Sequence, residues 1–298
     1  VAQPEGPHWA DERWERLLSA DRALTLGVPD DDAVASVAMC ATPEMLVAVT
    51  VAGRLLVDGD TIDSRSGRFL PAALTAAKKG PPLIALTNEG SAAVLWAADR
   101  IGRLARSVDG GRTWSPTVDI RKSILALAIG ADRSVVVLAA HDGQSEVLTS
   151  VDGGQWTAKS ALVDGRPLQV DIASTPWLAA GASCLAIGDA NGVWIARHGE
   201  DFRRVAASTN AQTIGLFTGT GPDASLVFAE SGADIEEATR LFRCTLDGRV
   251  EILAELTPPE DDRADAPAVL AMAWDEIAQS LRVAFSTMLS TVAPRAKA

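Results

Sequence analysis

The sequence predicts an all-β fold built from a repeated antiparallel unit, and three features support this prediction. Short apolar runs recur along the 298 residues, with starts about 40 to 55 residues apart. A second and often a third apolar run follows each of them at hairpin distance. Gly, Asp and Asn, which favour tight turns, separate the runs. Runs of this length between turn residues indicate strands rather than helices.

The first strand of each unit is expected in one of six runs: Ala35–Ala41, Leu83–Thr87, Ile124–Ile129, Val170–Ser174, Thr213–Thr218 and Ala268–Trp274. Three or four strands in each such interval is the period of a β-propeller blade. A single blade leaves both faces uncovered, so the blades must close into a ring to bury them. We therefore predict a six-bladed β-propeller, with seven blades as the alternative.

The N-terminal segment is expected to contribute a helix and a closing strand. The stretch Trp9–Ala20 places Ala10, Trp14, Leu17 and Leu18 on one side, which is typical of an amphipathic helix. Arg22–Val28 precedes the first blade, and we expect it to complete the last blade. Residues 1–21 are thus predicted as a tail with a short helix, and residues 22–298 as a single propeller. A second short helix is predicted to begin at Pro71.

Composition narrows the class of partner and the compartment. The formal net charge is −12, from 39 acidic and 27 basic residues, which argues against direct binding to nucleic acid. Every window of about 20 residues carries a charge or a proline, so no membrane-spanning helix is expected. The three cysteines are far apart and lie in apolar runs, which favours free thiols in a reducing compartment. We predict a cytoplasmic protein, with export followed by removal of a leader as the alternative.

One motif carries a resemblance to a known family. The segment Ser107–Trp114 reads SVDGGRTW and matches the pattern S-x-D-x-G-x-T-W in full. A second copy, Ser150–Trp156, has lost one residue before its Trp and lies 43 residues further on. The chain therefore resembles the Asp-box propellers, whose motif is also called the bacterial neuraminidase repeat, of the sialidase-like and WD40-like group.

The resemblance implies a structural role for these turns. In the family the box lies between the third and fourth strands of a blade, away from the ligand-binding face. An Asp in a tight turn accepts bonds from backbone amides, Gly supplies the unusual backbone angle, and Trp packs on the sheet. The structural Asp-box residues are therefore predicted as Ser107, Asp109, Gly111, Trp114, Ser150, Asp152, Gly154 and Trp156.

No catalytic residue is predicted. Sialidases, which the motif resembles, use a tyrosine nucleophile, and this chain contains no Tyr. The expected inner strands carry few polar residues. Asp171 is the one acid well inside them, and a single carboxylate supplies neither a catalytic pair nor an oxygen cage for Ca²⁺. The three histidines show no metal-ligand spacing. We predict a protein that is not an enzyme and that needs no cofactor or metal.

Charged links between blades suggest a docking face for a protein partner. Basic pairs precede the second and third inner strands, and acidic segments are expected across the ring. The possible partner-binding residues are Lys78, Lys79, Arg121, Lys122, Asp234, Glu236 and Glu237. The alternative is that these charged loops are merely solvated.

The predicted function is a non-catalytic protein–protein interaction or regulatory scaffold subunit in a bacterial multiprotein system. The alternative is a carbohydrate-binding or carbohydrate-active Asp-box propeller. That alternative requires exposed aromatic side chains, for which Trp9, Trp177 and Trp274 are the candidates.

Overall fold

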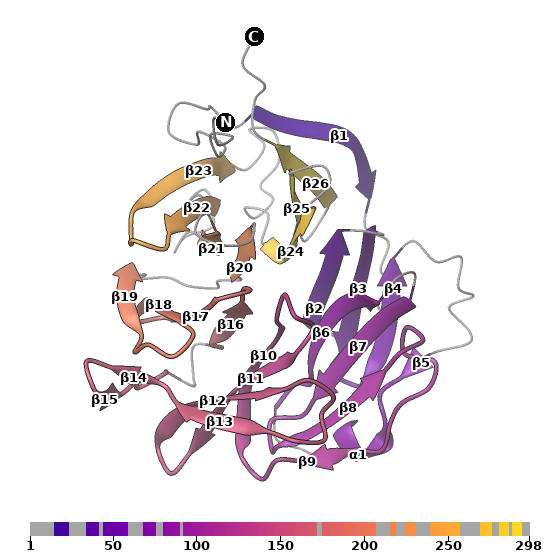
Figure 1. Cartoon of the computed structure of the whole chain (residues 1–298). Coiled ribbons are helices and arrows are strands. Elements are labelled where there is room, and N and C mark those ends of the chain that lie inside the picture. Colours follow the sequence, from indigo (N-terminus) through magenta and orange to yellow (C-terminus); the bar gives the residue numbers. More distant parts are fainter. Residues whose placement is uncertain are drawn as a thin grey trace, which may run out of the picture.

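The computed structural model consists almost entirely of antiparallel sheet. It describes residues 15–23, 34–41, 44–58, 68–75, 80–89, 92–171, 175–206, 215–218, 224–230, 239–256, 269–275, 280–285 and 288–293. Within these ranges there are six four-stranded sheets and one two-stranded sheet. Five of the four-stranded sheets surround a common centre as the blades of a β-propeller, and the sixth lies beside them in the ring (Figure 1).

Five of these sheets are each made of four consecutive strands. The first is β2 (Val34–Ala41), β3 (Glu44–Thr50), β4 (Arg54–Asp58) and β5 (Arg68–Phe69), and the second is β6 (Leu83–Glu89), β7 (Ala92–Ala98), β8 (Arg103–Ser107) and β9 (Val118–Asp119). The third is β10 (Ser123–Ile129), β11 (Val135–His141), β12 (Gln144–Ser150) and β13 (Thr157–Ser160). The fourth is β16 (Trp177–Ala180), β17 (Cys184–Asp189), β18 (Gly192–Arg197) and β19 (Arg203–Ala206), and the fifth is β20 (Gly215–Thr218), β21 (Ser225–Glu230), β22 (Thr239–Thr245) and β23 (Val250–Leu256).

The remaining four-stranded sheet joins the two ends of the chain. Strands β24 (Val269–Asp275), β25 (Ser280–Phe285) and β26 (Met288–Ala293) are followed in the sheet by β1 (Glu15–Ala23). The β1–β26 pairing is antiparallel, with Glu15 opposite Ala293 and Ala23 opposite Met288. The inner strand β24 contacts β2 of the first blade and β20 of the fifth, so this sheet closes the ring.

The predicted fold class therefore needs correction, although its all-β propeller character is confirmed. In the described part of the chain, five blades consist of four consecutive strands and the closing sheet is a composite. The molecule is thus not a ring of six or seven equivalent blades. The predicted N-terminal helix is also wrong, because residues 15–20 of that stretch belong to strand β1. The free edge of β26 explains this outcome, since unpaired backbone groups on a sheet edge bind a strand.

The fourth inner strand was also predicted at the wrong place. It is β16 (Trp177–Ala180), whereas residues 168–171 of the preceding segment are not in a strand. The displacement results from a two-stranded insertion, β14 (Leu162–Val163) and β15 (Arg166–Pro167). Its turn, Asp164-Gly165, has positive φ at both residues (50° and 72°), as a type I′ hairpin turn requires. The one described helix, α1 (Ala72–Thr75), is four residues long.

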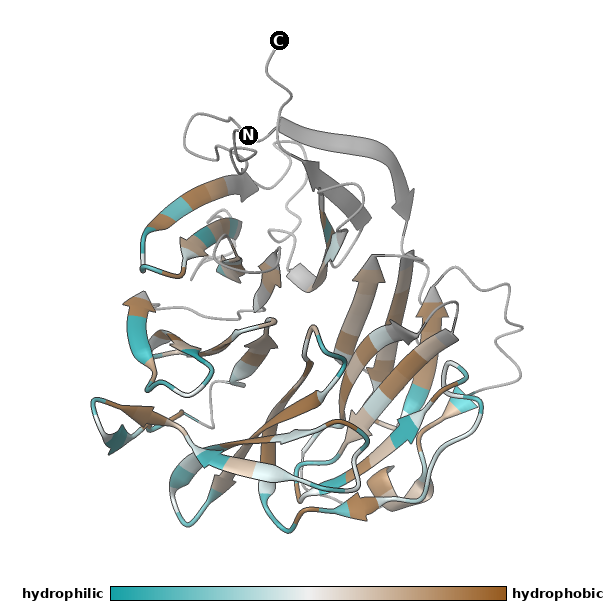
Figure 2. Ribbon diagram, viewed as in Figure 1, coloured by the Kyte–Doolittle hydropathy of each residue, from teal (hydrophilic) through white to brown (hydrophobic). Residues whose placement is uncertain are grey.

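The core lies between the blades. Figure 2 shows hydrophobic residues along the strands and hydrophilic residues at many of the turns. Val94 and Trp96 of β7 pack with Val135 and Val137 of β11 in the next blade, and all four are at most 3% exposed. Three other buried clusters likewise draw side chains from two neighbouring sheets, which is why one blade depends on the next.

Candidate functional site

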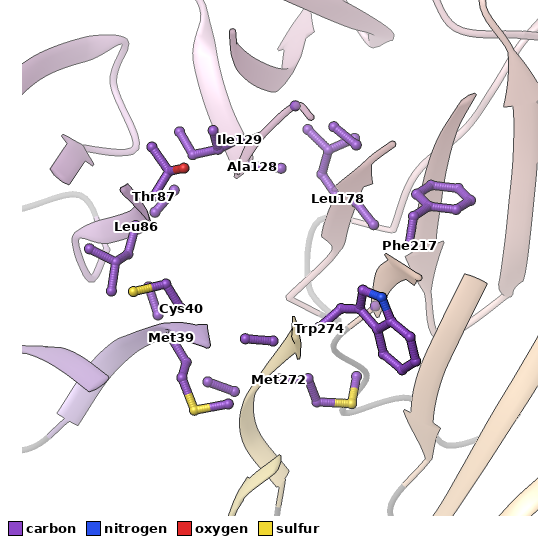
Figure 3. Close-up of a pocket in the computed structure, with 18 of the residues that line it drawn as sticks. Met39, Cys40, Leu86, Thr87, Ala128, Ile129, Leu178, Phe217, Met272 and Trp274 are labelled. Carbon is purple, nitrogen blue, oxygen red and sulfur yellow. The ribbon is translucent and has the colours of Figure 1, made fainter. Parts of the chain in front are cut away.

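A pocket lies at the centre of the ring, where the inner strands of all the four-stranded sheets converge (Figure 3). Its volume is about 370 Å³. The side chains labelled in the figure come from β2, β6, β10, β16, β20 and β24 and surround an open space. Since no single blade could form this pocket, it exists only in the closed ring.

The side chains of this central pocket are apolar. Among the lining residues that the structure describes, none carries a charged side chain. Met39, Met272, Phe217 and Leu178 are typical members of the lining, and Thr87 contributes a hydroxyl group. Such a lining favours an apolar group of a ligand, because burying a charge there would leave it without a partner.

Polar atoms in the central pocket come mainly from the backbone. Each inner strand is the terminal member of its sheet, so one of its edges faces the centre rather than a neighbouring strand. Backbone N–H and C=O groups on a strand edge are available for hydrogen bonds. The pocket therefore combines apolar side chains with backbone donors and acceptors.

The first box motif forms a compact network of hydrogen bonds in the turn between β8 and β9. The Ser107 hydroxyl donates to Asp109 Oδ1 at 2.8 Å and accepts from the Gly111 N–H at 2.8 Å. Asp109 also accepts from the Thr113 hydroxyl at 2.6 Å and from the N–H groups of Thr113 and Arg112. The Thr113 bonds, above all that of its side chain, hold the pKa of Asp109 well below its usual value.

The second motif makes a similar but smaller network between β12 and β13. The buried Ser150 hydroxyl accepts from the Gly153 N–H at 2.8 Å, and Asp152 accepts from the Gly154 N–H at 2.8 Å. The backbone bond from Gly154 is the main reason that the pKa of Asp152 is lowered. The Trp156 indole donates to the Gly153 carbonyl at 3.0 Å. Both turns thus join a third strand to a fourth strand.

These turns also contact the preceding blade. Leu55 of β4 lies beside Gly111, where an added Cβ would come within 2.6 Å of its side chain. Trp96 of β7 lies beside Gly153, where an added Cβ would be 2.4 Å from the ring. At both positions φ is positive, 86° and 81°, so the site requires glycine for its backbone angle as well as for space.

Sequence reasoning missed a repeated polar contact between blades. A basic side chain on the fourth strand of one blade donates to a backbone carbonyl of the next blade, in the turn between its third and fourth strands. The pairs are Arg68 Nη1 with the Gly110 carbonyl at 2.8 Å, Lys159 Nζ with the Glu200 carbonyl at 3.0 Å, and Arg203 Nη1 with the Asp247 carbonyl at 3.1 Å. The sequence pattern that could have indicated this contact is a basic residue 41 to 44 positions before each carbonyl, a separation of about one blade.

Two residues of the predicted docking face are described. Arg121 is exposed in the link between β9 and β10, with φ of 56°. Lys122 forms an ion pair with Glu146 of β12 and is therefore engaged within its own blade. The other five residues predicted for this face, Lys78, Lys79, Asp234, Glu236 and Glu237, lie outside the described residues. The complementary charge pattern stays a prediction.

The candidate aromatic platform is not assembled in the described residues. Trp177 is 7% exposed and packs between Gly188 of its own blade and Gly215 of the next, where an added Cβ would meet its ring within 2.3 Å. Trp274 is half-buried in the central pocket, and Trp9 lies outside the described residues. Asp171 precedes the inner strand rather than lying in it, and its N–H donates to Asp189. This correction follows from the new position of β16.

The cysteines are free thiols in three different environments. Cys184 and Cys244 are buried, and burial raises the pKa of both, to about 11 for Cys244. Cys40 is half-buried and lines the central pocket. A thiol is reactive as the thiolate, so the two buried cysteines are expected to be inert in the folded protein.

No group of three or more His, Cys, Asp or Glu side chains in the described part of the chain is arranged to hold a metal ion. No helix in the same ranges is long and apolar enough to cross a membrane.

Comparison with known proteins shows the fold. No family model matches the chain, and no curated protein matches its sequence. Solved structures with similar folds include the RRP9 WD40 repeats, at 9% identity over 95% of this chain and 100% of that one, with a TM-score of 0.55. Virginiamycin B lyase from Staphylococcus aureus is 12% identical over 92% of this chain and 98% of the lyase chain, with a TM-score of 0.53. YCF48 bound to a D1 peptide is 14% identical over 90% of this chain and 80% of the YCF48 chain, with a TM-score of 0.50.

Proposed function

We propose that this chain is a non-catalytic interaction subunit that binds an uncharged peptide segment of a partner protein in its central pocket. A bulky apolar side chain of that segment enters the pocket, and the backbone of the segment bonds to the inner edges of the inner strands. The observation that carries the proposal is the apolar and uncharged lining of a pocket of about 370 Å³.

The choice of a peptide follows from the two kinds of surface in the pocket. The side chains offer apolar contact, whereas the inner strand edges offer backbone donors and acceptors. A peptide satisfies both, because it carries its own N–H and C=O groups beside apolar side chains. A purely apolar ligand would leave the strand edges without partners, which is unfavourable once water is excluded.

The solved structures support a binding role and leave room for others. The RRP9 repeats belong to the WD40 type, and YCF48 was solved bound to a D1 peptide, so this fold accommodates a peptide in another protein. Virginiamycin B lyase is an enzyme with a similar fold. The absence of catalysis in this chain is therefore part of the proposal.

Cys40 provides a direct readout of the pocket. Peptides selected from a displayed random library on the purified protein are expected to be uncharged and to contain a Leu, Phe or Met. Bound peptide should slow alkylation of Cys40 about tenfold or more, because the thiol lines the occupied space. Cys184 and Cys244 are internal controls, since both are buried whether or not peptide is bound.

A charge placed in the central pocket distinguishes this site from other surfaces. Thr87→Lys should abolish peptide binding, whereas Ala72→Lys, at an exposed position of α1, should leave it unchanged. Selected peptides that bind Thr87→Lys as well as the native protein, or that do not protect Cys40, would show that the central pocket is not the site. Binding on a glycan array without any peptide binding would favour the carbohydrate alternative.

A further inference from the structure

A second pocket lies between the third and fourth blades, β10–β13 and β16–β19, and has a volume of about 320 Å³. These two blades are neighbours in the ring (Figure 1). The base of this inter-blade pocket is apolar and includes Val136, Val147, Ala196 and Phe202, none more than 5% exposed. The preceding interface, between the second and third blades, has a bulky side chain at the corresponding place.

The register of the sheets identifies that corresponding place. Ser107 and Ser150, the first residues of the two box turns, each pair with the second-strand residue that immediately precedes Trp96 in β7 and Val136 in β11. Trp96 packs with residues of the third blade, and Val136 packs with residues of the fourth. Val136 therefore occupies in the third blade the position that Trp96 occupies in the second.

Trp96 fills the interface between the second and third blades. Its side chain is 3% exposed, and its ring lies so close to Gly153 of the third blade that a Cβ added there would be 2.4 Å away. Arg106, which is opposite Trp96 in β8, places its guanidinium carbon 6.0 Å from the centroid of the ring. An indole and a guanidinium group thus occupy this layer of the second blade.

Both of these side chains have smaller counterparts in the third blade. Val136 stands where the second blade has Trp96, and its partner in β12, Thr149, stands where the second blade has Arg106. Val136 and Thr149 both line the inter-blade pocket. The pocket is therefore the space that a tryptophan ring fills one blade earlier.

The glycine that faces this space shows the same difference. Gly199 follows Ala196 by three residues, as Gly153 follows Ser150, and both Ala196 and Ser150 pair with a second-strand residue that packs on the preceding blade. The two glycines have similar positive φ, 94° and 81°. Gly153 is buried against Trp96, whereas Gly199 is exposed and lines the pocket. Apart from its chain neighbours, no heavy atom of the described residues lies within 4 Å of a Cβ added at Gly199.

We propose that the inter-blade pocket binds an uncharged planar aromatic molecule of about the size of indole or naphthalene. Its ring enters the space between Val136 and Gly199 and lies against the aromatic ring of Phe202. The site is distinct from the central pocket and does not depend on the function proposed for that pocket.

The size and chemistry of the ligand follow from the lining. An apolar cavity of about 150 Å³ suffices for benzene, so a pocket of about 320 Å³ accommodates two fused rings. The charged side chains of the lining are exposed and remain in water, whereas a charge on the ligand would be buried among apolar groups without a partner. Phe202 favours an aromatic ring over an aliphatic ring of similar size, because two aromatic rings attract each other beyond their apolar contact.

The test compares 2-naphthol with decahydro-2-naphthol, which has the same carbon skeleton but puckered, aliphatic rings. Isothermal titration of the full chain should show saturable binding of one 2-naphthol molecule. The affinity for 2-naphthol should be about three- to tenfold higher than that for the decahydro compound, as expected from one aromatic contact.

Variants that fill the pocket locate the binding site. Val136→Trp places an indole where the second blade has one and should weaken 2-naphthol binding by about tenfold or more, because the ligand would have to displace the new ring. Its melting temperature should be unchanged or higher, since filling a cavity stabilises a fold. Val147→Phe, which narrows the same pocket from β12, decides the test by the same loss of binding if Val136→Trp does not fold. The control Val108→Trp adds the same side chain at an exposed position outside the pocket and should bind like the native protein.

Cys40 separates this site from the central pocket, which is also apolar. Because Cys40 lines the central pocket only, its alkylation should be equally fast with and without 2-naphthol. Protection of Cys40 by 2-naphthol would overturn the proposal, as would the absence of 2-naphthol binding. Equal affinities for the two naphthols, or native affinity for 2-naphthol in a folded variant with a filled pocket, would overturn it as well.

Discussion

Replacement of Ser107 by Ala tests whether the box turn is a stability element. Ser107 is 1% exposed, and its hydroxyl accepts from the Gly111 N–H and donates to Asp109, both at 2.8 Å. Without the hydroxyl, the Gly111 N–H is left without this acceptor in a buried place, which costs about 1–3 kcal/mol. We expect a loss of about 2 kcal/mol in the free energy of unfolding and a fall in melting temperature of about 4 °C.

The assay is urea unfolding followed by tryptophan fluorescence, together with peptide binding at low temperature. The urea concentration at the midpoint of unfolding should fall. The slope of the unfolding free energy against urea concentration should stay unchanged, because the surface exposed on unfolding is the same. Ser123→Ala, at an exposed serine where β10 begins, is the control and should change little. Asp109→Ala should likewise reduce stability and leave partner affinity unchanged. Unaltered stability in Ser107→Ala, or lost affinity with unaltered stability, would refute the structural role.

Three further predictions concern the same framework. Gly153→Ala should reduce the free energy of unfolding by more than Gly143→Ala does, as measured in the same urea titration. The backbone angle φ is positive at both glycines (81° and 76°), but only at Gly153 would the added Cβ lie 2.4 Å from the Trp96 ring. The stability difference between the native protein and Asp109→Asn should be constant above about pH 5 and should shrink below about pH 4. The pKa of Asp109 is lowered in the folded protein, so the stability that its carboxylate contributes is lost as the pH falls through that pKa. Cys244, with a pKa of about 11, should resist alkylation at pH 8 until urea unfolds the chain, which mass spectrometry of the labelled peptides can follow.

Local sequence signals located most of the strands correctly. The runs at Ile124–Ile129 and Ala268–Trp274 correspond to β10 and β24 within one residue. Alternation of apolar runs with Gly and Asp turns is a property of neighbouring residues, so it can be seen without the fold. The hydrogen bonds in the turns at Ser107–Trp114 and Ser150–Trp156 join residues at most four positions apart, so they too depend on neighbouring residues.

The errors arose where a local pattern competed with a distant partner. The helical pattern before residue 20 gave way to β1, because the edge of β26 supplies backbone bonds that a short isolated helix cannot match. The inner strand expected at Val170–Ser174 is displaced by the hairpin β14–β15, although the Asp164-Gly165 turn could have indicated it.

The sequence by itself determined the all-β class, the approximate repeat and the composition of the inner strands, because these depend on residue type and spacing. Tertiary structure alone decided that the closing strand is β1 at residues 15–23, that Trp177 is buried between two glycines, and that basic side chains connect successive blades. It also brought the uncharged inner strands together into the central pocket. This pocket is formed by residues far apart in the chain, so no local pattern could have shown it.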